Sequence, residues 1–174
     1  MNDFRRNSRR VANMLRHSDY PNYNAWVRND VVCEHLQLTM SDLEQIVVKD
    51  DRGRFEFSED GLMVRALYGH SIDVDLGLVP VNPPAMLYHG TAEKYIEVIS
   101  REGLKPRKRK YVHLTESIEE ATSVGTRHGS PVLLGVSAEA MVRDGGEFYK
   151  TRNGIWLAQE IPVRYITIIE QGNL

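Results

Sequence analysis

The chain has 174 residues, with 22 Lys and Arg against 24 Asp and Glu and a formal net charge of −2. Hydrophobic residues make up 41% and charged residues 26%, which is typical of a globular protein and excludes a disordered or collagen-like chain. Its apolar runs are far shorter than the ~18 residues of a membrane-spanning helix, so we expect no membrane association. The single cysteine, Cys33, excludes an internal disulfide and a zinc site built on cysteines. We therefore expect a reducing, cytoplasmic environment.

Basic residues gather in two short segments. Five arginines lie within the first 17 residues, and six Lys and Arg lie between residues 101 and 110. Because the net charge is near neutral, such local patches favour a specific polyanion site over general electrostatic capture.

The chain begins with an amphipathic helix, predicted over residues 4–17. Phe4, Val11, Met14 and Leu15 are predicted to fall near one face, and the arginines lie mostly on the other. A short strand is expected at Trp26–Val27 and a short helix at about residues 31–36.

The next segment is predicted to hold a third helix and a hairpin. Ser41 and Glu44 have the spacing of a capping box, which indicates the start of that helix. Strands follow at residues 54–57 and 62–67, joined by a turn at residues 58–61. Three small helices and a two-stranded wing are typical of a winged helix, a fold that usually binds nucleic acid.

A proline-rich segment, residues 75–86, separates two unlike halves. Pro84 restricts Pro83 to extended conformations, so we interpret this segment as a linker between domains of residues 1–79 and 80–174.

The second half is predicted to be α+β, with short strands at residues 86–89, 111–114, 132–136, 148–151, 155–158 and 165–169. Helices are expected at residues 92–102, where Gly103 follows the last turn, and at residues 117–124. The order is not a regular βαβ series, and no glycine-rich nucleotide-binding motif occurs.

Residues 87–91 are predicted to end a strand and open a helix. Gly90 would allow close backbone approach, and the helix start could hold an anion. A cap formed by Thr91 beside a core histidine, His89, explains the same residues equally well. Taken singly, the other histidines and arginines have similarly ordinary structural explanations.

Six short motifs nevertheless occur in one order: 15–17, 64–66 with 69–71, 87–91, 111–114, 124–132 and 153–157. Together they resemble the RNA 2′-phosphotransferases, the KptA family of tRNA 2′-phosphotransferases, over a region from about Ser8 to Tyr165. The chain departs from the usual family pattern at Ala25, at Tyr68 and at Thr115, and residues 19–30 match poorly.

The resemblance implies an N-terminal winged-helix RNA-binding domain and a C-terminal ADP-ribosyltransferase-like NAD-binding domain. It implies an enzyme, acting as in tRNA splicing, that removes an internal RNA 2′-phosphate with NAD as co-substrate. A 2′-phospho-ADP-ribosylated RNA intermediate would yield 2′-hydroxyl RNA, ADP-ribose 1″,2″-cyclic phosphate and nicotinamide. The partners are then RNA carrying a 2′-phosphate and NAD, and we expect a monomer that needs no metal.

The resemblance also implies roles for particular residues. It places catalysis on Arg16, His17, Arg65 and Arg127. It places NAD binding on His89, Gly90, Thr91, His113 and Thr115. Arginine suits phosphate because its planar guanidinium makes bidentate contacts. The family has an apolar residue, here near Ile155 or Trp156, where many ADP-ribosyltransferases carry glutamate; an anionic phosphate nucleophile needs no general base. The basic run 105–110 is either a solvated loop or a contact to RNA phosphates or to the pyrophosphate.

Two other functions are left open. The same fold could ADP-ribosylate phosphorylated RNA or DNA ends, which would also use the four phosphate-binding residues. A non-catalytic, winged-helix nucleic-acid-binding regulator is the third possibility, although it would not need those four residues together with two histidines. Nicotinamide release from NAD, with and without 2′-phosphorylated RNA, distinguishes the three.

Overall fold

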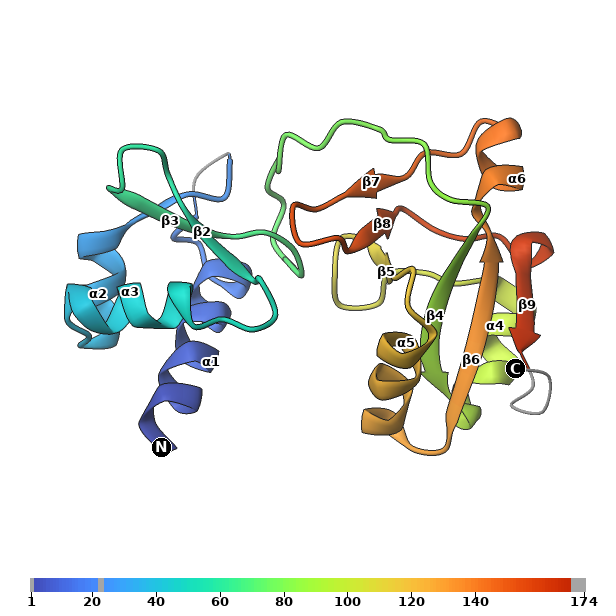
Figure 1. The fold of residues 1–174 in the computed structure, drawn as a ribbon, viewed down its shortest axis with the longest axis horizontal. Helices are drawn as coiled ribbons and strands as arrows, with labels where there is room; N and C mark the ends of the chain where they lie inside the picture. Colours follow the sequence, from blue (N-terminus) through green and yellow to red (C-terminus); the bar gives the residue numbers. More distant parts are fainter. Residues whose placement is uncertain (1, 22–23, 170–174) are drawn as a thin grey trace. The chain divides into compact units, whose positions relative to one another are not determined.

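The computed structural model describes residues 2–21 and 24–169, and the chain divides into two compact units (Figure 1). The first unit runs up to Leu78 and also includes Lys108–Lys110; the second unit comprises the rest. Asn22 and Tyr23, in the segment that matches the family pattern poorly, lie outside the described residues. None of the described helices is both long enough and apolar enough to cross a membrane.

Three helices and a three-stranded antiparallel sheet form the first unit. The helices are α1 (Asn2–His17), α2 (Asn29–Leu36) and α3 (Met40–Val48). The strands β1 (Val27–Arg28), β2 (Phe55–Phe57) and β3 (Met63–Ala66) pair in the order β1-β3-β2. Apolar side chains from all three helices and from β3 are buried together, among them Leu15, Val32, Leu43, Ile46 and Val64. The predicted helices and strands of this half are therefore present, each within a few residues of its expected bounds.

The start of α3 differs from the prediction. Thr39 is the N-cap: its hydroxyl accepts a hydrogen bond from Asp42 N at 3.1 Å, and Thr39 N donates to Asp42 Oδ2 at 2.9 Å. The capping box predicted from Ser41 and Glu44 is therefore wrong. Since α2 ends at Leu36, only three residues connect the helices, and the first hydroxyl after that turn caps α3.

The second unit contains two three-stranded antiparallel sheets. One consists of β4 (Met86–Ala92), β6 (Pro131–Ser137) and β9 (Ile166–Ile169), with β6 in the middle. The other consists of β5 (Val112–Leu114), β8 (Trp156–Ala158) and β7 (Tyr149–Lys150), with β8 in the middle. Antiparallel sheets with separate helices confirm the predicted mixed α+β class.

The helices of the second unit are short: α4 (Ile96–Glu102), α5 (Ile118–Gly125) and α6 (Ala138–Arg143). Three single helical turns accompany them: η1 (Glu93–Tyr95) leads from β4 into α4, η2 (Thr126–His128) joins α5 to β6, and η3 (Val163–Tyr165) precedes β9. Gly103 ends α4 with a φ of 77°, as predicted. Helix α6 was not predicted from the sequence. A shared core buries side chains such as Leu87, Leu134, Phe148 and Ile161.

The predicted junction at residues 87–91 is also wrong. Strand β4 continues to Ala92, because Gly90 and Thr91 pair with Leu133 and Val132 of β6. Neither residue begins a helix, and the cap position belongs to Ala92. Thr91 is therefore not a cap, and the helical turn begins at Glu93, beyond the predicted junction.

Gly90 has a packing role instead. A Cβ atom added there would lie 1.6 Å from Ala121 O and 2.9 Å from Gly125 N of α5. Helix α5 lies directly against β4 in Figure 1. The close backbone approach expected at Gly90 is thus made by α5.

We expect Gly90→Ala to destabilise the second unit, because two backbone segments would have to separate to admit one methyl group. The expected cost is at least about 2 kcal/mol, or roughly 10 °C in melting temperature for a unit of this size. Thermal unfolding followed by circular dichroism measures it. Ser123→Ala, on the exposed side of α5, is the matched control and should leave the melting temperature unchanged.

Candidate functional site

The end of α1 presents Arg16 to the segment that follows β3. Ser71 N donates a hydrogen bond to Arg16 O at 3.0 Å, which fixes this segment against the helix end. Gly69 has a φ of +87°, and a Cβ atom there would lie 3.3 Å from Arg16 Cζ. The guanidinium also lies over the ring of Tyr68, with Cζ 4.9 Å from its centroid. The positive φ therefore favours glycine at position 69, and a larger residue would also have to displace the Arg16 side chain slightly.

The Arg16 guanidinium is buried without acceptors for two of its nitrogens. Among the residues that the structure describes, Nε and Nη2 of Arg16 have no hydrogen-bond partner. Burial lowers the pKa of Arg16 to about 10, and the positive charges of Arg109 and Arg54 add to the effect. Buried donors normally find acceptors, so this group is suited to an incoming anion.

Two histidines accompany Arg16. His17 is exposed and its Nδ1 lies 2.8 Å from Ser71 Oγ. Burial lowers the pKa of His17, with help from the charges of Arg16 and Arg109. His70 is only 2% exposed, and neither of its ring nitrogens has a partner among the described residues. Burial first, and then the surrounding cations, lowers the pKa of His70 to about 4.

Arg65 is held differently, by a carboxylate and an aromatic ring. Its Nε and Nη2 both donate to Glu56 Oε1, at 2.6 and 2.5 Å. Its Cζ lies 4.4 Å from the centroid of the Trp26 ring. Strand register explains the ion pair, since Glu56 of β2 stands opposite Arg65 of β3. The guanidinium is therefore oriented before any ligand binds.

The basic run 105–110 is partly fixed in place. Lys110 Nζ donates to Asp73 Oδ1 at 2.8 Å and to Val74 O at 3.0 Å, and Lys110 N donates to His70 O at 3.0 Å. Residues 108–110 belong to the first unit for this reason. We call the charged and titratable groups gathered here the cation cluster, which consists of Arg16, His17, Arg65, His70 and Lys110.

In the second unit, β4 and β5 bring two predicted histidines together. Tyr88 and Thr115 exchange backbone hydrogen bonds of 2.8 and 3.0 Å, which aligns the end of β5 with β4. His89 Nδ1 lies 2.9 Å from His113 O. Because a carbonyl oxygen can only accept, the proton of neutral His89 is on Nδ1, and Nε2 is left as an acceptor.

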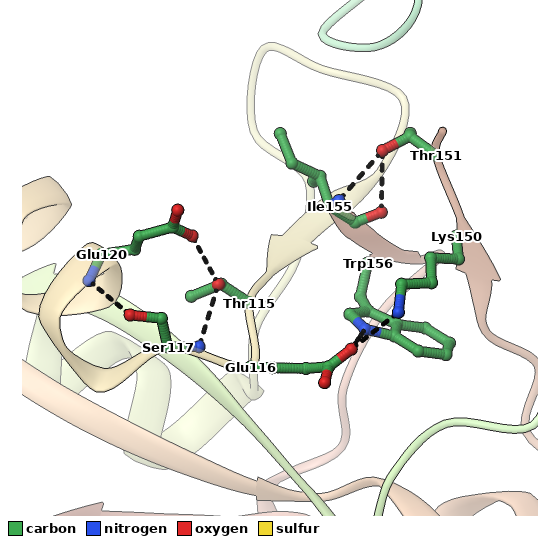
Figure 2. A network of polar contacts seen from close by, with 8 residues as sticks. All are labelled: Thr115, Glu116, Ser117, Glu120, Lys150, Thr151, Ile155 and Trp156. Carbon is green, nitrogen blue, oxygen red and sulfur yellow. Dashed lines mark hydrogen bonds and ion pairs between the residues drawn. The ribbon is translucent and has the colours of Figure 1, made fainter. Parts of the chain in front are cut away.

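Thr115 belongs to a polar network at the start of α5, shown in Figure 2. Its hydroxyl donates to Glu120 Oε2 at 2.7 Å and accepts from Ser117 N at 3.1 Å. The Ser117 hydroxyl in turn accepts from Glu120 N at 3.1 Å and caps α5. The network places the carboxylate of Glu120 beside Thr115.

A second carboxylate is fixed nearby, as Figure 2 also shows. Glu116 Oε1 accepts hydrogen bonds from Lys150 Nζ and from Trp156 Nε1, both at 2.8 Å. These two hydrogen bonds lower the pKa of Glu116. Lys150 Nζ also lies 4.8 Å from the centroid of the Trp156 ring. The register of β7 and β8, which pairs Lys150 with Trp156, makes this arrangement possible.

Comparison with known proteins agrees with the sequence motifs. The family model described as RNA 2′-phosphotransferase, Tpt1 / KptA family, matches residues 4–160. The chain belongs to the RNA 2′-phosphotransferase family. A relative from Acaryochloris marina is 45% identical over 128 residues, 74% of this chain and 71% of its own length. One from Agrobacterium fabrum is 48% identical over 126 residues, 72% and 68% of the two chains. One from Streptomyces coelicolor is 42% identical over 151 residues, 84% and 82% of the two chains.

Each of these three relatives bears the name "Probable RNA 2′-phosphotransferase". For this member of the family, the first unit contains Arg16, His17 and Arg65 in the cation cluster. The second unit contains Arg127, which is exposed on η2. His89, His113 and Thr115 are adjacent in the second unit, whereas Gly90 and Thr91 are buried in β4, where Gly90 is covered by α5.

Three residues near these side chains were not predicted as site residues: His70 in the first unit, and Glu116 and Lys150 in the second. His70 lies within the motif of residues 69–71, but the resemblance was not used to assign it a role. Glu116 follows β5 and Lys150 ends β7, and both strands pair with β8, so only the order β5-β8-β7 brings them together. No local pattern in the sequence indicates that order.

Proposed function

We propose that this protein is an NAD-dependent RNA 2′-phosphotransferase that removes an internal 2′-phosphate from RNA. The observation that carries the proposal is Arg16, a buried guanidinium with two nitrogens that lack a partner among the described residues, in a chain that belongs to this family. Burying such a charge is unfavourable, so a site that retains it is suited to bind a strongly charged oxyanion.

The proposed reaction has two steps that balance. A 2′-phosphate oxygen of the RNA forms a bond to the ribose carbon that carries nicotinamide in NAD, and the carbon–nicotinamide bond breaks. The 2″-hydroxyl of the transferred ADP-ribose then attacks the phosphorus, and the bond to the RNA 2′-oxygen breaks. The proton lost by the 2″-hydroxyl is matched by one gained at the RNA oxygen, which leaves a 2′-hydroxyl and ADP-ribose 1″,2″-cyclic phosphate.

The first unit is proposed to bind RNA as a winged helix and to hold the 2′-phosphate. Arg16 and Arg65 offer forked donors to phosphate oxygens, and that contact is strongest when charge builds up on them in the second step. His17 is proposed to protonate the departing RNA oxygen, because a bound phosphate would offset the positive charges that lower the pKa of His17 in the unliganded protein. Arg127 of the second unit is proposed as a further phosphate donor.

The second unit is proposed to bind NAD as an ADP-ribosyltransferase-like domain. The acceptor Nε2 of His89 suits a hydroxyl or amide donor of NAD, and the bond to His113 O keeps the imidazole in that tautomer. The carboxylates of Glu116 and Glu120 are acceptors for ribose hydroxyls. The Thr115 hydroxyl already donates to Glu120, so its proposed contribution is to position that carboxylate.

Nicotinamide release tests the proposal. The full chain is incubated with NAD alone, with RNA carrying one internal 2′-phosphate, with the same RNA lacking it, and with RNA bearing a terminal phosphate. We expect release only with the internal 2′-phosphate, together with 2′-hydroxyl RNA. Stable ADP-ribosylation of the terminal phosphate would indicate an end-modifying transferase instead. Binding of RNA without any nicotinamide release would indicate a regulator and contradict the proposal.

His89→Ala is expected to raise the KM for NAD by at least tenfold while the affinity for 2′-phosphorylated RNA stays unchanged. The acceptor at Nε2 is lost, whereas the cation cluster lies wholly in the first unit. Steady-state kinetics with varied NAD and a separate RNA-binding titration measure the two quantities. His35→Ala, whose imidazole contacts Tyr20 on the surface of the first unit, is the control. Lost RNA binding with normal use of NAD would overturn this division of roles.

A further inference from the structure

His70 is a buried imidazole whose ring makes no hydrogen bond to any residue that the structure describes. It is 2% exposed, yet both Nδ1 and Nε2 are without a partner among the residues that the structure describes. Its backbone is fixed, since His70 O accepts from Lys110 N at 3.0 Å. Buried polar side chains are normally hydrogen-bonded, because an unsatisfied group costs ~1–3 kcal/mol. The ring therefore needs an explanation other than packing.

The surroundings of His70 indicate what would satisfy it. The charged and titratable groups that act on the ring are Arg16 and His17 from α1, Arg65 from β3 and Lys110 from the basic run. All four are cations or bases, and none is a carboxylate. Arg65 already has Glu56 and Lys110 already has Asp73, whereas two nitrogens of Arg16 lack an acceptor. An anion bound by these nitrogens of Arg16 would also be close enough to His70 to interact with its ring electrostatically.

We propose that His70 is a further phosphate-contacting residue, whose ring N–H donates a hydrogen bond to an oxygen of the anion bound by Arg16. The identity of that anion as the RNA 2′-phosphate rests on the proposed function. The binding of an anion by Arg16 and His70 does not, because it follows from the buried donors alone.

The proposal has a consequence for protons. The pKa of His70 is lowered to about 4 in the unliganded protein by burial and by four positive neighbours. A bound anion offsets those charges and raises this pKa, so binding is linked to proton uptake. The affinity for the anion is then highest below the unliganded pKa and falls as the pH rises through the liganded pKa.

Sulfate is the probe for the test, because it has the shape of phosphate and keeps its charge over the relevant pH range. The pKa of each histidine is measured by nuclear magnetic resonance on the full chain, with and without sulfate at constant ionic strength. We expect sulfate to raise the pKa of His70 by at least one unit and to leave that of His35 unchanged. Absence of sulfate binding, or binding that does not move His70, would overturn the proposal.

Two variants give an independent measurement. His70→Phe keeps the volume but removes the donor, and we expect a 10- to 100-fold weaker affinity for sulfate, on the order of one hydrogen bond to a charged group. His70→Asn keeps an N–H donor and should lose less. Equal affinity in His70→Phe and the wild type would contradict the proposal. If either variant does not fold, the wild-type titration still decides.

The outcomes separate this inference from the proposed function. A sulfate response at His70 without nicotinamide release from NAD and 2′-phosphorylated RNA would retain the anion site and reject the proposed reaction. If nicotinamide is released but sulfate does not change the pKa of His70, the proposed reaction is supported and the proposed role of His70 is wrong.

Discussion

Replacement of Arg16 by methionine is expected to make the protein more stable and to slow removal of the 2′-phosphate by about 100- to 1000-fold. Burial lowers the pKa of Arg16 from its ordinary value to about 10, which corresponds to on the order of 3 kcal/mol against the charged form in the folded state. Methionine fills a similar volume without a charge, so the melting temperature should rise by several degrees. Thermal unfolding and single-turnover dephosphorylation measure the two effects.

Arg54 provides the matched control in the same unit. Its guanidinium donates to Asp50 Oδ1 at 2.6 Å and to Ser8 Oγ at 2.8 Å, and the Asp50 side chain is only 1% exposed. Arg54→Met leaves that carboxylate buried without its ion-pair partner, with only the hydrogen bond from the backbone N of residue 54, at an expected cost of ~3–5 kcal/mol. The two arginine-to-methionine changes should thus shift stability in opposite directions. An Arg16→Met protein that is destabilised like Arg54→Met, or that dephosphorylates RNA normally, would show that Arg16 is structural.

Replacement of Arg65 by alanine is expected to block the second chemical step more than the first. In the first step the ribose carbon gains positive charge, so a nearby cation offers no help. In the second step the phosphate oxygens gain charge as the RNA oxygen leaves, and a guanidinium aimed at them stabilises that transition state, typically by about 100- to 1000-fold in rate. We therefore expect Arg65→Ala to release nicotinamide and to accumulate RNA carrying a 2′-phospho-ADP-ribosyl group, detected by mass spectrometry of the RNA.

Arg28→Ala is the control for charge removal in the same unit. Arg28 and Asp30 form an ion pair whose side chains are 68% and 61% exposed, so its loss should change neither step. Arg65→Lys should resemble Arg65→Ala, because lysine lacks the flat fork that Glu56 and Trp26 orient. If Arg65→Ala binds both substrates but releases no nicotinamide, the residue is needed for the first step and the assignment is wrong.

Much of the fold could be predicted from the sequence because its signals are local. The amphipathic pattern of Val11, Met14 and Leu15 predicted α1, and the alternation around Val64 and Ala66 predicted β3. The capping box was misplaced by two residues through a choice between neighbouring hydroxyls, whereas the error at residues 87–91 arose from a longer-range contact. Pairing of β4 with β6 extended the strand through Gly90 and Thr91, and no local pattern reports that pairing.

The site was predictable to the extent that it follows motifs. Arg16, His17 and Arg65 were predicted and lie in one cluster, while their catalytic roles stay predictions. His70 was missed because its significance depends on burial and on missing partners, neither of which the sequence shows. The position of Lys110 against Asp73 was likewise out of reach, since 36 residues separate them in the chain.

The fate of the phosphorus atom tests the central claim most directly. RNA with a single radiolabelled internal 2′-phosphate is incubated with the full chain and NAD, and the labelled products are separated. We predict that all released label appears in ADP-ribose 1″,2″-cyclic phosphate, in amounts equal to the nicotinamide and to the 2′-hydroxyl RNA formed. Label released as inorganic phosphate, at a rate independent of NAD, would contradict the claim and indicate a simple phosphatase.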